Sequence, residues 1–196
     1  MAKREPVVSD TKQRILDAAL AVFGERGYRG ASVDEVAAAA GVTKGAVYYW
    51  FEDKEDLARD LQHLLWQRLA ETALDVYDPQ QPALQNLTTC FEAFLEAVRE
   101  VPAARGFLRE AWFSPELDAA GRADHEAWLE VVRTLLQDGI SRGELVVVDV
   151  EAAARILAGA LMEATLHVLG SGDIASTLDV IGRILEAFAA APAPSA

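Results

Sequence analysis

The chain has 196 residues, of which 52% are hydrophobic, one cysteine and a formal net charge of −13. A single cysteine excludes an internal disulfide and fits a reducing cytoplasm. No apolar run reaches the about 18 residues of a membrane span, and no signal-peptide core follows Lys3 and Arg4, so we expect a cytoplasmic protein without a membrane partner.

The negative charge argues against a nucleic-acid partner, but it is unevenly spread. Residues 1–60 hold 9 basic and 11 acidic side chains, whereas residues 61–196 hold 9 basic and 20 acidic ones. Because phosphates attract lysine and arginine, any DNA contact belongs to the first part of the chain. We expect such binding to depend on a few placed contacts rather than on a basic surface.

The first predicted helix begins at Asp10 and ends near Gly27, after a basic arm over residues 1–8. A helix-turn-helix follows over about 32–51. Ser32 and Glu35 have the spacing of a capping box, Gly41 suits the tight turn, and Thr43 can cap the second helix. We therefore expect Lys44, Gly45, Tyr48 and Tyr49 to point away from the small core.

The remainder of the chain is also predicted to be helical. Asp53 caps a long helix that runs to about Tyr77, and we place the domain boundary inside it, near Leu61. First-turn prolines and glycine stops predict the rest: helices near 82–99, 102–113, 115–142, 149–169 and 173–190. Glu144 to Val148 is the only strand-like run and is expected to be an extended linker without a partner strand.

The expected architecture is all-α in two domains, with residues 1–61 forming the helix-turn-helix domain. Residues 62–191 form the second helical domain and 192–196 a disordered tail. The last two predicted helices are apolar on more than one side, which requires two packing partners. Two interpretations stay open: a fully buried core pair, or a homodimer interface. The candidates for the interface are Ile156, Ala160, Leu178, Ile181 and Leu185.

The run from Arg14 to Leu57 reads R-IL-AA-A-VFGERGYRGASVDEVAAAAGVTKGAVYYWFEDKEDL. It resembles the DNA-binding domain of the TetR family of bacterial transcriptional regulators, whereas the later part of the chain matches only in general plan. The resemblance implies a homodimeric regulator, usually a repressor, that binds a pseudo-palindromic double-stranded DNA operator. It also implies release from the operator by a small-molecule effector, which the sequence does not identify.

The resemblance implies DNA contacts at seven positions: Ser32, Thr43, Lys44, Gly45, Tyr48, Tyr49 and Lys54. Hydroxyls, ammonium groups and helix N-termini are the donors that phosphates accept, which agrees with these residue types. For Tyr48 the alternative is a packing aromatic, and for Lys44 it is an ordinary solvated lysine. Arg29 is a further candidate phosphate contact.

A ligand pocket in such a domain should be apolar with a few polar groups. Aromatic residues concentrate in the middle helices, and the favoured lining residues are Phe94, Trp112, Trp128 and Met162. Most aromatics at helical spacing are ordinary core residues. An apolar or aromatic effector fits better than a strongly anionic one because this domain is acidic, and a cation is the alternative.

No catalytic motif, metal-ligand spacing or cofactor-binding loop is found, so we expect neither an enzyme nor a bound metal or cofactor. The three histidines are scattered, and Cys90 has no second cysteine near it in the sequence. The competing hypothesis is a helical small-molecule-binding protein or enzyme whose helix-turn-helix does not bind an operator. Binding of upstream DNA would distinguish the two.

Overall fold

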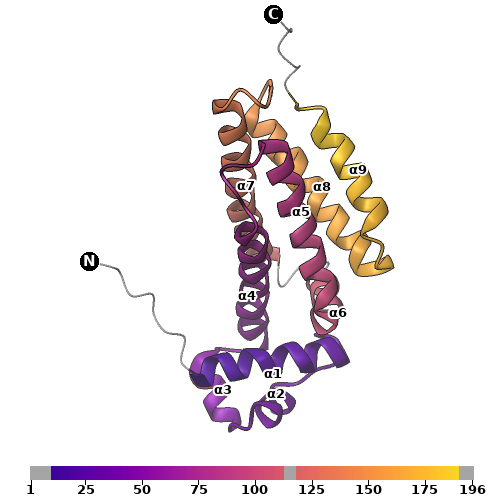
Figure 1. Ribbon diagram of the computed structural model, residues 1–196. Helices are drawn as coiled ribbons and strands as arrows, with labels where there is room; N and C mark the ends of the chain where they lie inside the picture. The colour runs from indigo at the N-terminus through magenta and orange to yellow at the C-terminus, as the bar shows by residue number, and fades with distance from the viewer. Residues whose placement is uncertain (1–9, 113–117, 190–196) are drawn as a thin grey trace, which may run out of the picture. The chain divides into compact units, whose positions relative to one another are not determined.

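The computed structural model describes residues 10–112 and 118–189, leaving aside the side chains at 102–103, 111–112, 118–125 and 127. The expected arm and the expected disordered tail lie outside these residues. Within them, the all-α expectation is confirmed (Figure 1). The helices are α1 (Asp10–Arg26), α2 (Val33–Ala40), α3 (Lys44–Trp50), α4 (Lys54–Asp75), α5 (Ala83–Glu100), α6 (Pro102–Trp112), α7 (Asp118–Ser141), α8 (Val150–Ser171) and α9 (Ala175–Glu186).

The helices divide into two compact units, which differ from the two sequence segments that we expected. The first unit covers residues 1–65 together with 102–121, and the second covers 66–101 together with 122–196. The first division falls within α4, the helix in which we placed the domain boundary. The unit that contains the helix-turn-helix therefore also contains α6, a helix from much later in the chain.

The first unit is built on α1, which packs against both α2 and α6. Phe23 of α1 is completely buried, and its ring centre lies 5.5 Å from that of Phe107 on α6. A Cβ atom added to Gly106 would lie 3.2 Å from the carbonyl oxygen of Gly24, so the two helices approach closely. Because the buried rings of Phe23 and Phe107 pack together and the two helices approach closely, α6 is part of the core of this unit.

The helix-turn-helix is closed by local hydrogen bonds, as the sequence predicts. The Glu35 N–H donates to the Ser32 hydroxyl, and the Ser32 N–H donates to the Glu35 carboxylate over 2.9 Å, which completes the capping box. Gly41 ends α2 with φ of 65°, a conformation that other residues rarely adopt. The Thr43 hydroxyl accepts the Ala46 N–H over 3.1 Å and so caps α3.

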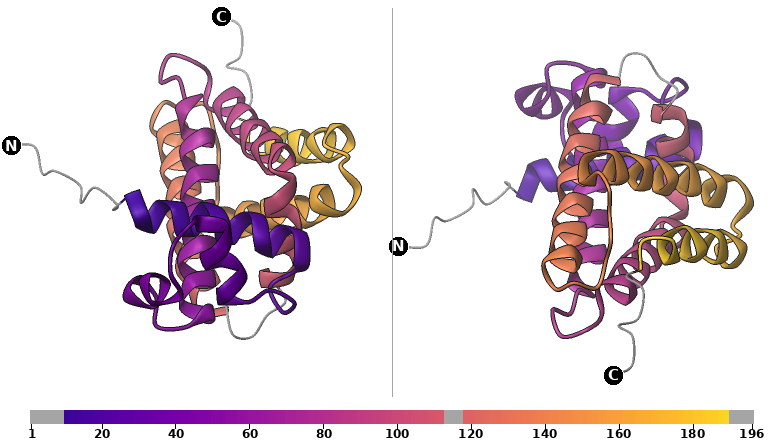
Figure 2. Two further views of the ribbon diagram at one scale, coloured as in Figure 1. Left: turned by 90° about the horizontal axis from the view of Figure 1, so that it is seen from below. Right: turned by 90° about the horizontal axis from the view of Figure 1, so that it is seen from above.

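In the second unit, α5 packs against α8 and α9. Figures 1 and 2 show α8 and α9 side by side, joined by a short turn. Buried leucine and phenylalanine side chains of α5, among them Leu87, Phe91 and Leu95, supply much of the core. By length and composition α8 could also cross a membrane, but half of its apolar stretch is buried, as in an ordinary core helix.

The segment from Glu144 to Val148 is not a linker without a partner, which corrects our expectation. Leu145 and Ala189 form an isolated antiparallel bridge, and the Val146 N–H donates to the Phe188 carbonyl over 2.8 Å. The last helix ends at Glu186 rather than near 190, because the chain after it turns to make this bridge. Two short segments thus satisfy part of each other's backbone hydrogen bonds.

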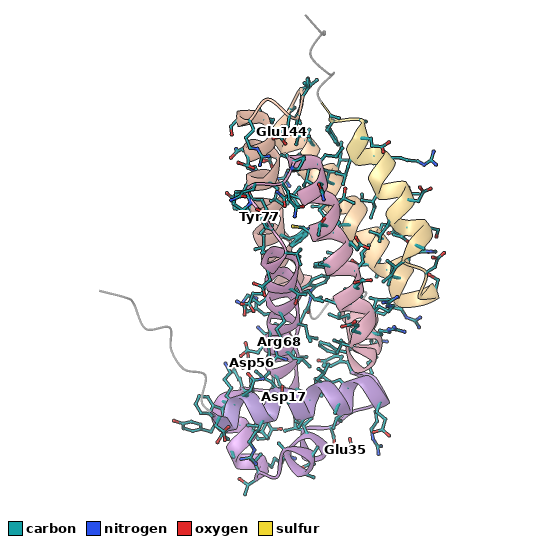
Figure 3. All side chains as sticks on the ribbon, viewed as in Figure 1. Asp17, Glu35, Asp56, Arg68, Tyr77 and Glu144 are labelled. Carbon is teal, nitrogen blue, oxygen red and sulfur yellow. The ribbon has the colours of Figure 1, made fainter. Side chains whose placement is uncertain are left out.

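A polar cluster joins the α4–α5 loop to the end of α7 in the second unit. The Glu144 carboxylate accepts hydrogen bonds from the Ala83 N–H and the Arg142 guanidinium, both over 2.5 Å. These bonds, the Ala83 N–H first, hold the pKa of the Glu144 carboxyl below its ordinary value. The Tyr77 hydroxyl contacts Asp138 over 3.2 Å, and Figure 3 labels Tyr77 and Glu144 in this region.

Candidate nucleic-acid interface

The recognition helix α3 presents a small and aromatic face to solvent. Tyr49 is 79% exposed and Tyr48 is 47% exposed, so the packing alternative for Tyr48 is wrong. Gly45 is exposed as well, whereas Val47 and Phe51 are buried beneath the helix. Gly45 has no side chain and lies between exposed polar and aromatic residues. The backbone of α3 can therefore approach a bound molecule closely at this position.

The hydroxyl groups of Ser32 and Thr43 have a structural role in the isolated chain. Each caps the helix that follows it, so each lies at a helix N-terminus beside N–H groups that have no partner within the helix. Ser32 also donates its hydroxyl hydrogen to the Glu35 carboxylate over 2.8 Å. The hydrogen bond from the Ser32 side chain is the main reason that the pKa of Glu35 is lowered. Figure 3 labels Glu35 on α2.

Lys44, the first residue of α3, forms an ion pair with Asp34 of α2. The distance between Lys44 Nζ and Asp34 Oδ2 is 2.8 Å, and both side chains are at least half exposed. This hydrogen bond raises the pKa of the Lys44 ammonium, which keeps its positive charge at neutral pH. Lys44 is therefore held on the exposed side of the helix-turn-helix by an acidic neighbour, rather than being freely solvated.

Lys54 lies at the start of α4 but is directed into its own unit. Its ammonium donates to the carbonyl oxygens of Tyr28 over 2.9 Å and Ala31 over 3.0 Å. The same nitrogen lies 4.6 Å from the centre of the Tyr28 ring, within cation–π range. Two of its three hydrogens are thus engaged by the α1–α2 linker, residues 27–32, which leaves one for the phosphate contact that the sequence suggested.

Glu110 of α6 contacts the same linker, a contact that sequence reasoning did not predict. Its carboxylate accepts the N–H of Tyr28 over 2.6 Å and that of Arg29 over 3.2 Å. More than 80 residues separate these partners along the chain. No periodicity or local motif could reveal the contact.

An open cleft of about 410 Å³ lies beside this contact and is lined by Arg29, Gly106, Arg109 and Glu110. Of the expected pocket residues, Phe94, Trp128 and Met162 are not among the described residues that line it. Arg29 therefore borders α6 rather than being an isolated candidate phosphate contact.

Of the expected pocket residues in the second unit, Phe94 and Trp128 lie in contact with each other. The Phe94 ring centre lies 4.9 Å from that of Trp128 and 6.0 Å from that of Trp66, so the three rings form a cluster in which Trp66 is stacked on Phe94 and Trp128 is tilted to it by 39°. Trp128 is 8% exposed, and its indole N–H has no acceptor among the described residues. Met162 is half-buried on α8. The side chain of Trp112 lies outside the described residues.

The expected interface residues divide into two groups. Ile181 and Leu185 are buried within their own chain, so they belong to its core and not to an exposed interface, which corrects our assignment. Ala160 and Leu178 are half-buried, and Ile156 is 63% exposed. The neighbouring exposed apolar residues are Val180 and Ile184 on α9. Helix α9 therefore uses one apolar side within the chain and presents part of another to solvent.

The described residues contain no group of histidine, cysteine and acidic side chains that could hold a metal ion. Cys90 is a buried free cysteine, and burial raises the pKa of its thiol. Since the thiolate is the reactive form, this cysteine suits a packing role better than a redox role.

Two family profiles cover most of the chain. Residues 15–61 match the profile described as bacterial regulatory proteins of the tetR family, and residues 84–191 match that of a tetracyclin repressor-like C-terminal domain. The chain belongs to the TetR family. This TetR-family protein is therefore a DNA-binding transcriptional regulator with an N-terminal helix-turn-helix and a helical C-terminal domain.

Individual relatives agree with this family. The regulator SrpR of Pseudomonas putida is 30% identical over 171 residues, covering 84% of this chain and 78% of SrpR. The regulator AcrR of Shigella flexneri is 40% identical over 73 residues, which cover 37% of this chain and only 34% of AcrR. The solved structure of FadR from Bacillus subtilis in complex with stearoyl-CoA is 22% identical with a TM-score of 0.76, covering 89% of this chain and 95% of that one.

Proposed function

We propose that this TetR-family repressor binds a pseudo-palindromic operator as a homodimer through α3 and leaves it when an apolar or aromatic effector binds. The observation that carries the proposal is the outward face of α3, where Lys44, Gly45, Tyr48 and Tyr49 are exposed above a buried Val47. Two such helices on one dimer would enter successive major-groove faces about 34 Å apart. The remaining assigned contacts, Ser32, Thr43 and Lys54, would bind phosphates.

Support for the homodimer comes from α8 and α9. Ile156 is 63% exposed, Val180 57% and Ile184 37%, which places large apolar side chains at the surface of both helices. A Cβ atom added to Gly159 or Gly182 would meet nothing within 4 Å, so these helices have small-residue sites open to a close neighbour. A second copy of the same two helices would cover this surface symmetrically.

Support for the effector class comes from the ring cluster of Trp66, Phe94 and Trp128. Aromatic lining with few polar groups favours a ligand with a large apolar or aromatic surface. An effector that prefers one arrangement of the dimer would lower the population of the arrangement that fits the operator. We place this activity in the cytoplasm, where the operator is.

A fluorescence anisotropy titration with DNA from upstream of the protein's own coding sequence tests this proposal. We expect saturable binding that competitor DNA of unrelated sequence does not displace. The double variant Lys44→Ala, Tyr49→Ala should lose at least tenfold in affinity, since charged and stacking contacts are each worth about 1–3 kcal/mol. Arg99→Ala removes one exposed positive charge from α5 in the second unit and serves as the control that should leave binding unchanged.

Equal affinity of the wild type for operator and unrelated DNA at low salt would contradict the proposal. It would favour a helical small-molecule-binding protein or enzyme whose helix-turn-helix does not recognise an operator. Mass spectrometry of the native protein would then still reveal a co-purified ligand.

A further inference from the structure

We infer that Glu110, a residue of α6, is a positioning residue for operator binding. The inference rests on the DNA-binding function of the chain and adds a residue from outside the sequence segment of the helix-turn-helix. Glu110 would not contact DNA. It acts through the α1–α2 linker, whose geometry determines where α2 begins.

The first observation is the contact itself. The Glu110 carboxylate accepts two successive backbone N–H groups, from Tyr28 over 2.6 Å and from Arg29 over 3.2 Å. A carboxylate that accepts two backbone donors is held more strongly than a neutral acceptor would be. Both of these N–H groups lie in the linker, beyond the end of α1 at Arg26.

The linker is shaped to receive this carboxylate. Gly27 has φ of +75°, and a Cβ atom at this position would lie 2.9 Å from Oε2 of Glu110. Any larger residue would therefore be strained by its backbone conformation and would also crowd the carboxylate. Tyr28 anchors the turn, since its buried ring packs edge-to-face on Phe23 at 5.7 Å.

Lys54 holds the same linker through the complementary backbone groups. Its ammonium donates to the carbonyls of Tyr28 and Ala31, while Glu110 accepts N–H groups of Tyr28 and Arg29. An acid from α6 and a base from α4 thus bind opposite polar groups of one short segment. The α1 helix also restrains this region, through the packing of Tyr28 on Phe23 and the ion pair between Arg26 and Glu35. The side chains that hold the linker's own backbone groups, however, come from helices that lie later in the chain.

The position of α2 matters for DNA because its first turn carries Ser32 and unpaired N–H groups suited to phosphate. Helix α2 also packs directly against α3. A hydrogen bond at 2.6 to 3.2 Å is lost when its partners separate by about 1 Å, so a small displacement of Glu110 would free the linker. With the linker freed, α2 would adopt several orientations relative to α1. Only one of these orientations would fit the operator, so operator affinity would fall.

Neutralisation of Glu110 distinguishes two explanations of its role, because they predict opposite changes in operator affinity. If Glu110 acts only through its charge, its neutralisation should strengthen DNA binding, as phosphates repel carboxylates. If it positions the linker, its neutralisation should weaken operator binding. Glu25→Gln is the matched control, because Glu25 is an exposed acid of α1 in the same unit and undergoes the same change of charge.

The experiment measures the affinity of the full chain for its operator and for unrelated DNA of equal length. We expect Glu110→Ala to weaken operator binding about tenfold and Glu110→Gln, which keeps a neutral acceptor, about threefold. Affinity for unrelated DNA should stay level or rise in both variants. Glu25→Gln should leave the ratio of the two affinities at its wild-type value.

Thermal unfolding of the wild type and of each variant shows whether a substitution destabilises the whole fold, which a loss of linker positioning alone would not do. A merely structural role would lower the two DNA affinities by the same factor, and that result would overturn the inference, as would stronger operator binding by Glu110→Gln. If Glu110→Ala does not fold, Glu110→Gln provides the test alone, because it loosens the linker by a smaller change. Failure of the wild type to bind its operator would instead contradict the proposed operator recognition.

Discussion

Lys44 Nζ lies 2.8 Å from Asp34 Oδ2, so the lysine that begins the recognition helix carries its counter-charge on the helix before it. A phosphate that approaches Lys44 must compete with this carboxylate or share the ammonium with it. Asp34 therefore reduces attraction to any DNA, whatever its sequence. This is one physical means by which an acidic regulator limits non-specific binding.

Asp34→Asn should strengthen binding to unrelated DNA several-fold and to the operator by a similar or smaller factor. The variant removes a carboxylate near the phosphates and frees the Lys44 ammonium. The slope of log affinity against log salt concentration should become steeper by about 1, as expected for one more neutralised phosphate. Anisotropy titrations over a series of salt concentrations measure both quantities.

The matched comparison is Asp34→Asn in a Lys44→Ala background. Without the lysine, the change in salt slope should disappear, although loss of the repulsive carboxylate still raises affinity slightly. An unchanged slope in both backgrounds would show that Asp34 does not restrain Lys44.

The capping box of Ser32 and Glu35 predicts that the free energy of unfolding depends on pH in the acidic range. The folded-state pKa of Glu35 lies below its ordinary value of 4.5, mainly because of the hydrogen bond from the Ser32 side chain. A lowered folded pKa stabilises the fold above pH 4.5, and this contribution is lost as the pH falls through the folded value. Ser32→Ala should lower the free energy of unfolding by about 1 kcal/mol at neutral pH.

The difference between the wild type and Ser32→Ala should therefore shrink as the pH is lowered below 4.5, in urea unfolding curves followed by circular dichroism. Ser141→Ala is the control, because that hydroxyl donates to the Asp138 carbonyl and contacts no carboxylate. A difference that stays constant down to pH 3 would show that the Ser32–Glu35 contact contributes no pH dependence.

The indole N–H of Trp128 predicts one polar feature of the effector. It is buried without an acceptor among the described residues, beside the rings of Phe94 and Trp66. A ligand carbonyl that accepts this hydrogen bond would satisfy a group that is otherwise costly to bury. As probes, 2-acetylnaphthalene and 2-ethylnaphthalene have similar shapes and differ in one acceptor.

We expect the wild type to bind the acetyl probe about fivefold more tightly than the ethyl probe by tryptophan fluorescence quenching or calorimetry. Trp128→Phe keeps an aromatic ring and should reduce this preference to near unity. Trp66→Phe removes an indole from the same cluster and should retain it. An equal preference in the wild type and in Trp128→Phe would exclude this role of the N–H.

The exposed apolar surface of α8 and α9 predicts the assembly state. Ile156→Asp or Val180→Asp places a charge on that surface and should convert a dimer into a monomer at micromolar concentration, with little loss of helicity. Val148→Asp is the control, since Val148 is fully exposed and lies outside both helices. Sedimentation velocity measures the outcome, and a dimer that survives both α8 and α9 substitutions would place the interface elsewhere.

Local features of this chain could be predicted from its sequence because neighbouring residues determine them. Ser32 with Glu35, Gly41 and Thr43 each act within one helical turn, and their caps are confirmed. The expectation that Tyr48 and Tyr49 face solvent is confirmed for the same reason, since helical periodicity fixes which side of α3 is buried.

Contacts between distant segments could not be predicted in the same way. Glu110 and the linker it binds, or Leu145 and its partner Ala189, meet only because of packing between elements. Lys54 shows a related limit, because its residue type suits a phosphate and a backbone carbonyl equally well. Periodicity also could not tell that Ile181 and Leu185 face the core while Val180 faces solvent, since α9 is apolar on both sides.

The inclusion of α6 in the first compact unit bears on how this regulator can be recombined with others. Chimaeric regulators are commonly imagined as an exchange of one N-terminal segment for another. Here a graft of residues 1–65 alone would leave behind Phe107, Gly106 and Glu110, and with them the surface that covers Phe23 and holds the linker. A chimaera that keeps the operator specificity of this chain would need to include α6 as well. Alternatively, the acceptor protein would need a helix with a phenylalanine, a glycine and a glutamate at the same positions.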